Sequence, residues 1–138
     1  KIEAIRLSIG AKMNLGDVGK KTVPKMCLVA PARAGGAIST RTFIPHRVHE
    51  AIGVLGAVSV AAACVAEGSI AAEIAKTAPG AKTQRLDVEH PTGFFTVDME
   101  VSRENGELKV RRSALLRTAR TLMRGEIYVP AAVWNGKP

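Results

Sequence analysis

The 138-residue chain is long enough for one domain with its own core and too short for two. Hydrophobic residues make up 46% of it and aromatic residues only 4%, which excludes a disordered chain and leaves the core mainly to aliphatic side chains. The formal net charge of +8 favours an anionic partner. Because the basic residues are scattered and few aromatics can stack on bases, we expect a small anion and no nucleic acid.

The two cysteines, Cys27 and Cys64, lie in apolar runs and form no CxxC pair. This spacing excludes a zinc ribbon and a redox motif, and favours buried, reduced thiols in a cytoplasmic protein. No signal peptide is visible, and the apolar run over residues 53–66 is too short to span a bilayer, so no membrane contact is expected. The histidines lack further ligands of the right kind nearby, so no metal site is expected.

Residues 1–15 carry apolar side chains at helical spacing and lead into Gly16, which predicts a first helix. A helix that starts at the first residue without a cap indicates an interior segment of a longer chain. Residues 26–30 are wholly apolar between two prolines and predict a buried strand. Residues 37–44 alternate and predict a second strand. One side of that strand carries Ile38, Thr40, Thr42 and Ile44.

A helix is predicted over residues 54–66, after a loop that contains His46 and His49. Its sequence is apolar all round, which is typical of a central helix buried on every side. Residues 69–76 fit either a strand or a short helix, and residues 77–82 form a loop around a Pro-Gly turn.

The remaining sequence predicts a series of strands. Residues 85–89 and 95–101 alternate on either side of a turn at residues 90–93. Asn105 and Gly106 predict a tight hairpin turn into a strand over residues 108–116. A turn or short helix over 118–124, a last strand over 126–129 and a loosely ordered tail over 130–138 complete the chain. Together these elements predict an α+β domain in which a mostly antiparallel sheet wraps around one buried apolar helix.

The entrance of the central helix is the first candidate site. Gly53 and Gly56 leave backbone N–H groups uncovered at the positive end of the helix dipole, where a carboxylate or phosphate fits. The same glycines can instead serve only close packing. His46 and His49 precede this helix and can orient a substrate, although each can equally be satisfied by backbone groups alone.

Arginine side chains are the second candidate, because their fork suits planar carboxylates. Arg41 lies on the strand that leads into the histidine loop. It is the only arginine whose position in the sequence favours a role in substrate binding. Arg117 and Arg120 flank Thr118 near the end of the hairpin. Solubility is the alternative role for any single arginine.

Three segments carry a family resemblance. They are residues 44–60 (IPHRVHEAIGVLGAVSV), residues 23–31 (VPKMCLVAP) and the closing part from 90–93 (HPTG) to 124–130 (RGEIYVP). In this order and spacing they resemble the second half of the PrpF-like isomerases, the 4-oxalomesaconate tautomerases in particular. The closing part is also similar to the end of diaminopimelate epimerase. The resemblance covers nearly the whole chain.

The resemblance implies a protein of two similar halves, each with strands around a central helix, and a substrate held between them at the helix N-termini. Residues 1–138 would be the C-terminal half, and the missing N-terminal half would be its partner. The epimerase has a catalytic cysteine at each helix entrance, where this chain has Gly53. The catalytic lysine and cysteine of the PrpF-like branch are expected in the absent half, so this fragment alone should be inactive.

The implied reaction moves a proton along the allylic system of a small anionic di- or tricarboxylate such as 4-oxalomesaconate, as in the degradation of aromatic compounds, without a cofactor. Cationic groups and helix amides would stabilise the enolate-like intermediate. Isomerases of the aconitate or methylitaconate type and a non-catalytic, basic anion-binding module remain open alternatives, and so does a homodimer. The residues expected to bind substrate are Arg41, His46, His49, Gly53, Leu55, Gly56 and Ala57.

Overall fold

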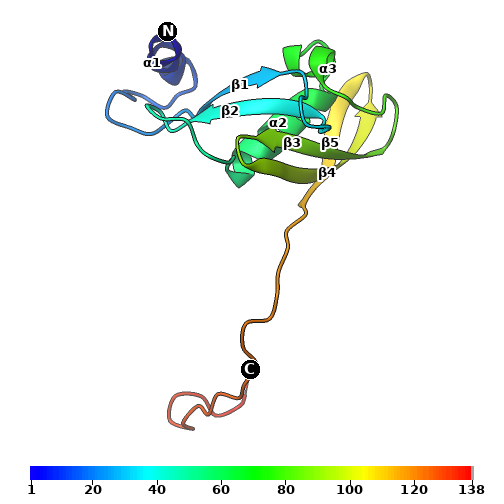
Figure 1. The fold of residues 1–138 in the computed structure, drawn as a ribbon. Coiled ribbons are helices and arrows are strands. Elements are labelled where there is room, and N and C mark those ends of the chain that lie inside the picture. Colours follow the sequence, from blue (N-terminus) through cyan, green and yellow to red (C-terminus); the bar gives the residue numbers. More distant parts are fainter. Residues whose placement is uncertain (138) are drawn as a thin grey trace.

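The computed structural model describes residues 1–137 as one curled sheet with α2 across its inner face (Figure 1). The strand order in the sheet is β1-β2-β3-β4-β5. The elements are α1 (Ile2–Lys12), β1 (Met26–Ala30), β2 (Ile38–Phe43), α2 (Val54–Val65), α3 (Ile70–Ile74), β3 (Thr83–His90), β4 (Gly93–Glu104) and β5 (Glu107–Leu115).

Two antiparallel units meet at one parallel pair of strands. β1 pairs with β2, and β3, β4 and β5 pair in succession, all antiparallel. β2 and β3 run parallel, with Ile38 opposite Val88 and Ser39 opposite Glu89. Parallel neighbours need a crossover connection, and here the crossover contains α2 and α3. The predicted α+β fold with a mostly antiparallel sheet is therefore confirmed.

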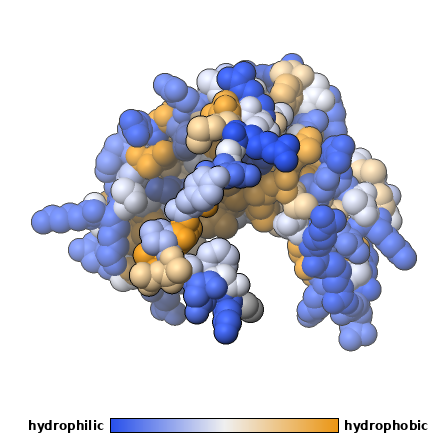
Figure 2. Space-filling model, turned by 90° about the horizontal axis from the view of Figure 1, so that it is seen from below, coloured by the Kyte–Doolittle hydropathy of each residue, from blue (hydrophilic) through white to orange (hydrophobic). Residues whose placement is uncertain are grey.

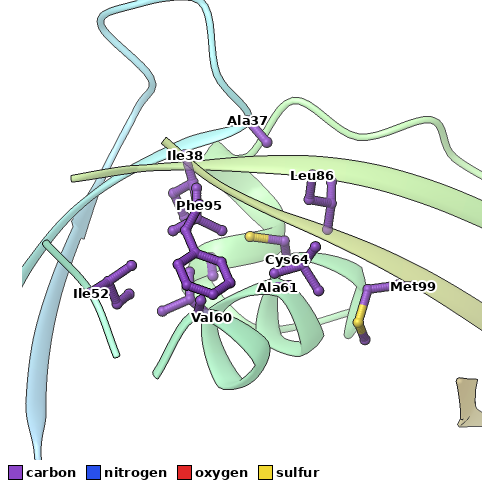
Figure 3. Close-up of a cluster of buried hydrophobic side chains, with 13 residues drawn as sticks. Ala37, Ile38, Ile52, Val60, Ala61, Cys64, Leu86, Phe95 and Met99 are labelled. Carbon is purple, nitrogen blue, oxygen red and sulfur yellow. The ribbon is translucent and has the colours of Figure 1, made fainter. Parts of the chain in front are cut away.

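Alternation along the strands gives the sheet one apolar face, and this face packs against α2 (Figure 3). The buried strand side chains on it are Ile38, Leu86, Val88, Phe95, Val97 and Met99. The helix contributes Ala57, Val60, Ala61 and Cys64, which recur at three- and four-residue spacing along one side. Because two of these four are alanines, the helix axis can lie close to the strands.

The apolar sequence of α2 predicted a helix buried on every side, and this prediction is wrong. Val54 is 46% exposed and Leu55 is 80% exposed, and Ser59 also lies at the surface. The sheet covers one face of the helix and α3 packs beside it. The first turn of α2 therefore has apolar side chains that no other described residue covers.

The two ends of the chain also differ from prediction. α1 is shorter than predicted and presents Ile5 and Met13 to solvent, while Arg6 and Gly10 face inward. The ambiguous residues 69–76 contain α3. The turn or helix predicted over 118–124 and the strand predicted over 126–129 are wrong, because this segment runs away from the sheet and finds no neighbouring strand there (Figure 1).

The carboxylate of Glu89 fastens the β1–β2 loop across the parallel pair. Glu89 is only 4% exposed, and its carboxylate accepts N–H bonds from Arg33 (2.8 Å), Ala34 (2.7 Å) and Gly36 (2.9 Å). These bonds, that from Arg33 first, hold the pKa of Glu89 below its ordinary value. A Cβ at Gly36 would lie 2.6 Å from the Asp87 carbonyl oxygen, so only glycine lets the loop come this close.

Replacing Glu89 with glutamine should lower the free energy of unfolding by about 2 kcal/mol, because three converging N–H groups lose their charged acceptor. Urea unfolding followed by circular dichroism measures this. Glu100→Gln removes an exposed carboxylate from β4 and should change the stability by less than about 0.5 kcal/mol. Equal losses in the two variants would contradict the fastening role of Glu89.

The same carboxylate should make the stability fall in acid. The pKa of Glu89 is lower in the folded chain than its ordinary value of 4.5, so the unfolded chain takes up the proton first. The contribution of Glu89 is therefore complete above about pH 4.5 and is lost as the pH falls through the folded pKa. Unfolding midpoints measured between pH 7 and roughly pH 3 should decline less steeply for Glu89→Gln than for the wild type. Parallel curves would argue against this coupling.

Candidate functional site

The N-terminal end of α2 is open. Gly53 is the N-cap, with extended backbone (φ −71°, ψ 154°), no side chain caps the helix, and its first turn has no acidic residue. The Gly53 carbonyl oxygen accepts the Ala57 N–H at 2.9 Å, so the N–H groups of residues 54–56 have no intrahelical acceptor. Nothing lies within 4 Å of the place where a Gly53 side chain would begin. The helix therefore presents partial positive charge to solvent here.

The other predicted helix residues differ in what they can offer. Leu55 is the most exposed side chain of the first turn. A Cβ at Gly56 would lie 3.3 Å from Ile52 Cγ1, so this glycine lets Ile52 pack on the turn. Ala57 is fully buried and its N–H already donates to Gly53. Gly53, Leu55 and Gly56 thus lie at the open end, and Ala57 supplies packing but no free donor.

The two predicted histidines lie in the loop that leads to α2 and make different contacts. The backbone N–H of His49 donates to the Thr42 carbonyl at 2.7 Å, which folds the loop back on β2. The Nδ1 of His49 accepts the Ala51 N–H at 3.0 Å, which leaves Nε2 as the ring donor of the neutral imidazole. His46 is exposed, with its Nδ1 3.9 Å from Glu3 Oε2 on α1. His49 is thus partly satisfied by backbone, and His46 lies toward α1.

Arg6 fixes the position of Glu3 opposite this loop. Its side chain is fully buried, and its guanidinium donates to both carboxylate oxygens of Glu3 at 2.7 Å. The same group donates to the carbonyls of Val18 (3.0 Å), Lys21 (3.1 Å) and Val23 (2.6 Å). The hydrogen bond from Arg6 holds the pKa of Glu3 below its ordinary value, so Glu3 faces His46 as a carboxylate.

The β3–β4 turn closes the other side of the loop. Thr92 Oγ1 donates to the carbonyl of Glu50 at 2.8 Å. The N–H of Thr92 donates to His90 Nδ1 at 3.3 Å, which holds the turn itself. Residues 90–93 therefore lie at the same end of the molecule as the loop that enters α2.

Arg41 is not brought to this end of the helix. Along β2 the side chains of Ile38, Thr40 and Thr42 are buried toward the core, whereas Arg41 is exposed. Its Nη1 donates to the carbonyl of Thr40 at 2.7 Å. Because α2 packs on the core face, alternation places Arg41 on the opposite face of the sheet. Its role in substrate binding stays a prediction, without a contact to the helix entrance.

Arg117, which the sequence did not favour over other arginines, lies over the core residue Phe95. The N–H of Leu116 still donates to the Thr96 carbonyl at 3.2 Å, one bond beyond β5. The guanidinium carbon of Arg117 then lies 5.5 Å from the centre of the Phe95 ring. Ile52, which directly precedes the N-cap, lies beside that ring (Figure 3). The β4–β5 register decides which residue reaches Phe95, and an irregularity in that ladder makes the register hard to read from the sequence.

A cavity of about 640 Å³ lies at the opposite end of α2, with Cys64, Glu67, Lys82 and Arg103 among its lining residues. Here the helix presents its carbonyl end, and Glu67 is paired with Arg103, so the place is unfavourable for an anion. None of the predicted site residues lines it. Burial raises the pKa of Cys64 to about 11, so this thiol stays protonated near neutral pH.

No helix within residues 1–137 is long and apolar enough to cross a membrane. In the same range, no three His, Cys, Asp or Glu side chains come together in a way that could hold a metal ion.

Comparison with known proteins bears on nearly the whole chain. The family model described as PrpF protein matches residues 1–130. A 4-oxalomesaconate tautomerase of Pseudomonas putida is 53% identical over 136 residues, which are 99% of this chain and 36% of that protein. A (4E)-oxalomesaconate Delta-isomerase of Novosphingobium sp. is 57% identical over 129 residues, which are 94% of this chain and 35% of that protein.

Among solved structures, the crystal structure of methylitaconate-delta-isomerase matches with a TM-score of 0.65 at 19% identity. The match covers 95% of this chain and 37% of that one, and it supports the fold. The chain spans about a third of the length of the curated relatives it matches. Since the family model covers almost all of its residues, the chain belongs to the PrpF protein family.

Proposed function

We propose that this chain supplies part of the substrate-carboxylate site of an isomerase that moves a proton within a small di- or tricarboxylate, with 4-oxalomesaconate as the first candidate. The observation that carries the proposal is the open N-terminal end of α2, where no side chain caps the N–H groups and the first turn has no acidic residue. The similarity to two relatives named for oxalomesaconate supports this choice of substrate.

The chemistry follows from what such a site stabilises. Removing a proton next to a carboxylate builds negative charge that spreads over the allylic system and its carboxylate oxygens. The N–H groups of residues 54–56 offer fixed donors for that charge, and His49 in the preceding loop has its Nε2 left as a further donor. The step needs an acid and a base and no change of oxidation state, so the proposed reaction is cofactor-independent.

Neither cysteine of the described residues is suited to act as the base. Burial raises the pKa of both Cys27 and Cys64, so neither thiolate forms readily near neutral pH. We assign the acid and the base to the part of the protein that the relatives have beyond this chain. Residues 1–138 act as the C-terminal half of such a protein.

Uncovered apolar surface supports a second folded part. Leu122, Met123, Ile127, Tyr128 and Val133 of the segment after β5 are between 78% and 90% exposed. Figure 2 shows apolar surface in a hollow on the face seen from below, flanked by hydrophilic side chains. Soluble domains rarely leave this much apolar surface in water. The missing half covers it, and a second copy of the chain is the other partner that would do so.

Placing an aspartate at the N-cap of α2 tests the anion site. In Gly53→Asp the new carboxylate should occupy the free N–H groups, raising the stability by roughly 0.5 kcal/mol. The same change should weaken binding of an inert tricarboxylate, tricarballylate, by at least about tenfold, because the donors are taken. Calorimetry on the full-length protein measures the affinity. Gly53→Ala meets no neighbouring atom and leaves the donors open, so it should bind like the wild type. Wild-type affinity in Gly53→Asp would reject the site.

Proton exchange tests the reaction. Full-length protein in deuterated water should incorporate deuterium into 4-oxalomesaconate as the double bond shifts, observed by proton NMR. The 138-residue chain alone should show none, because the proposed acid and base lie in the rest of the protein. Exchange only into cis-aconitate or methylitaconate would support the other isomerase type. Binding of all three compounds without exchange would leave the anion-binding module, and activity of the isolated chain would refute the division of roles.

A further inference from the structure

We propose that Arg117 is a second carboxylate-binding residue, set on the ring of Phe95 beside the N-terminal end of α2, and that it gives the site its preference for tricarboxylates. The inference rests on the proposed function and names a residue and a specificity that the function leaves open. Its starting point is the guanidinium carbon of Arg117, 5.5 Å from the centre of the Phe95 ring.

The ring of Phe95 is a fixed platform. Phe95 is 6% exposed and belongs to the buried core. In β4 it lies opposite Val88 of β3, and Ile52 and Val60 lie around its ring (Figure 3). A guanidinium held over an aromatic face by a cation–π contact still has its N–H groups free for a carboxylate. The platform therefore orients the arginine without using its donors.

The platform also ties Arg117 to the helix entrance. Ile52 packs on the first turn of α2, where the Cβ that Gly56 lacks would lie 3.3 Å from Ile52 Cγ1. Phe95 thus has Arg117 over its ring and Ile52, the residue before the N-cap, beside it (Figure 3). On this proposal, one carboxylate of a ligand binds at the free N–H groups and another binds Arg117.

A groove beside the platform has room for part of such a ligand. It has a volume of about 280 Å³ and is lined by Phe94, Phe95 and Thr96 of β4 and by Leu116, Arg117 and Thr118 after β5. Its lining combines apolar surface with hydroxyl groups and one cation, which fits the carbon chain and carboxylate of a small organic acid. None of the ion pairs formed among residues 1–137 involves Arg117, so its charge is available.

Arg124 offers a control for Arg117 in the same segment. Arg117 and Arg124 both follow β5 and both are exposed. Only Arg117 is held on an aromatic ring. Arg124→Gln therefore removes the same charge from the same segment without touching the platform, and serves as the matched control.

The experiment compares binding of tricarballylate, with three carboxylates, and glutarate, with two, to full-length protein by calorimetry. Arg117→Gln should weaken tricarballylate binding roughly 10- to 100-fold and leave glutarate binding within about threefold, which removes the preference for three carboxylates. Arg117→Lys keeps the charge but loses the fork, so it should restore only part of the preference. Arg124→Gln should keep the wild-type ratio of tricarballylate to glutarate affinity.

If Arg117→Gln and Arg124→Gln had the same ratio of tricarballylate to glutarate affinity, the inference would be overturned while the proposed function would stand. Full recovery by Arg117→Lys would also overturn it, because a point charge would then suffice. A wild-type protein that binds neither acid and does not exchange protons would overturn the proposed function, and this inference with it.

Discussion

The packing of α2 on the core face of the curled sheet is the contact on which the other features depend. Ala57 and Ala61 keep the helix close to the strands, and Phe95 fills the space at its N-terminal end. This packing sets where Gly53 and the free N–H groups lie relative to the β3–β4 turn. The candidate site therefore depends on core packing together with the hydrogen bonds that hold its loop, from His49 N–H to Thr42 and from Thr92 Oγ1 to Glu50.

Ion pairs within the sheet use part of the positive charge of the chain. Several basic residues of the sheet are used in ion pairs, among them Arg85 with Asp98 and Arg111 with Glu104. The net charge of +8 is therefore not spread evenly over the molecule as available charge. Within residues 1–137, Arg117 forms no ion pair and lies over the Phe95 ring, so its charge can attract an anion there.

Much of the fold could be predicted from the sequence, because its signals are local. The alternation around residues 95–101, the Asn105-Gly106 turn and the apolar run of α2 each report on a few neighbouring residues. The exposed outer face of α2 could not be predicted, since an all-apolar helix looks alike whether one face or every face is covered. The strand predicted over residues 126–129 failed because a strand needs a partner, which a propensity does not supply.

The site was predictable only where it follows from helix geometry. Open N–H groups at Gly53 need nothing beyond the end of a helix without a capping side chain, and the structure has such an end. The face on which Arg41 lies depends on strand alternation and on which face α2 covers. The proximity of Arg117 to Phe95 depends on the register of two strands. Contacts of that kind join segments distant in the chain and leave no local pattern.

The single parallel pair between β2 and β3 has a consequence for how the molecule forms. Each antiparallel unit is built from hairpins, whose contacts are local and form quickly. The parallel pair joins residues far apart in sequence and must enclose the whole crossover, including the loop of His46 and His49. We therefore expect the two hairpin units to be assembled before the seam between them, so that the helix entrance is among the last parts of the molecule to take its native shape.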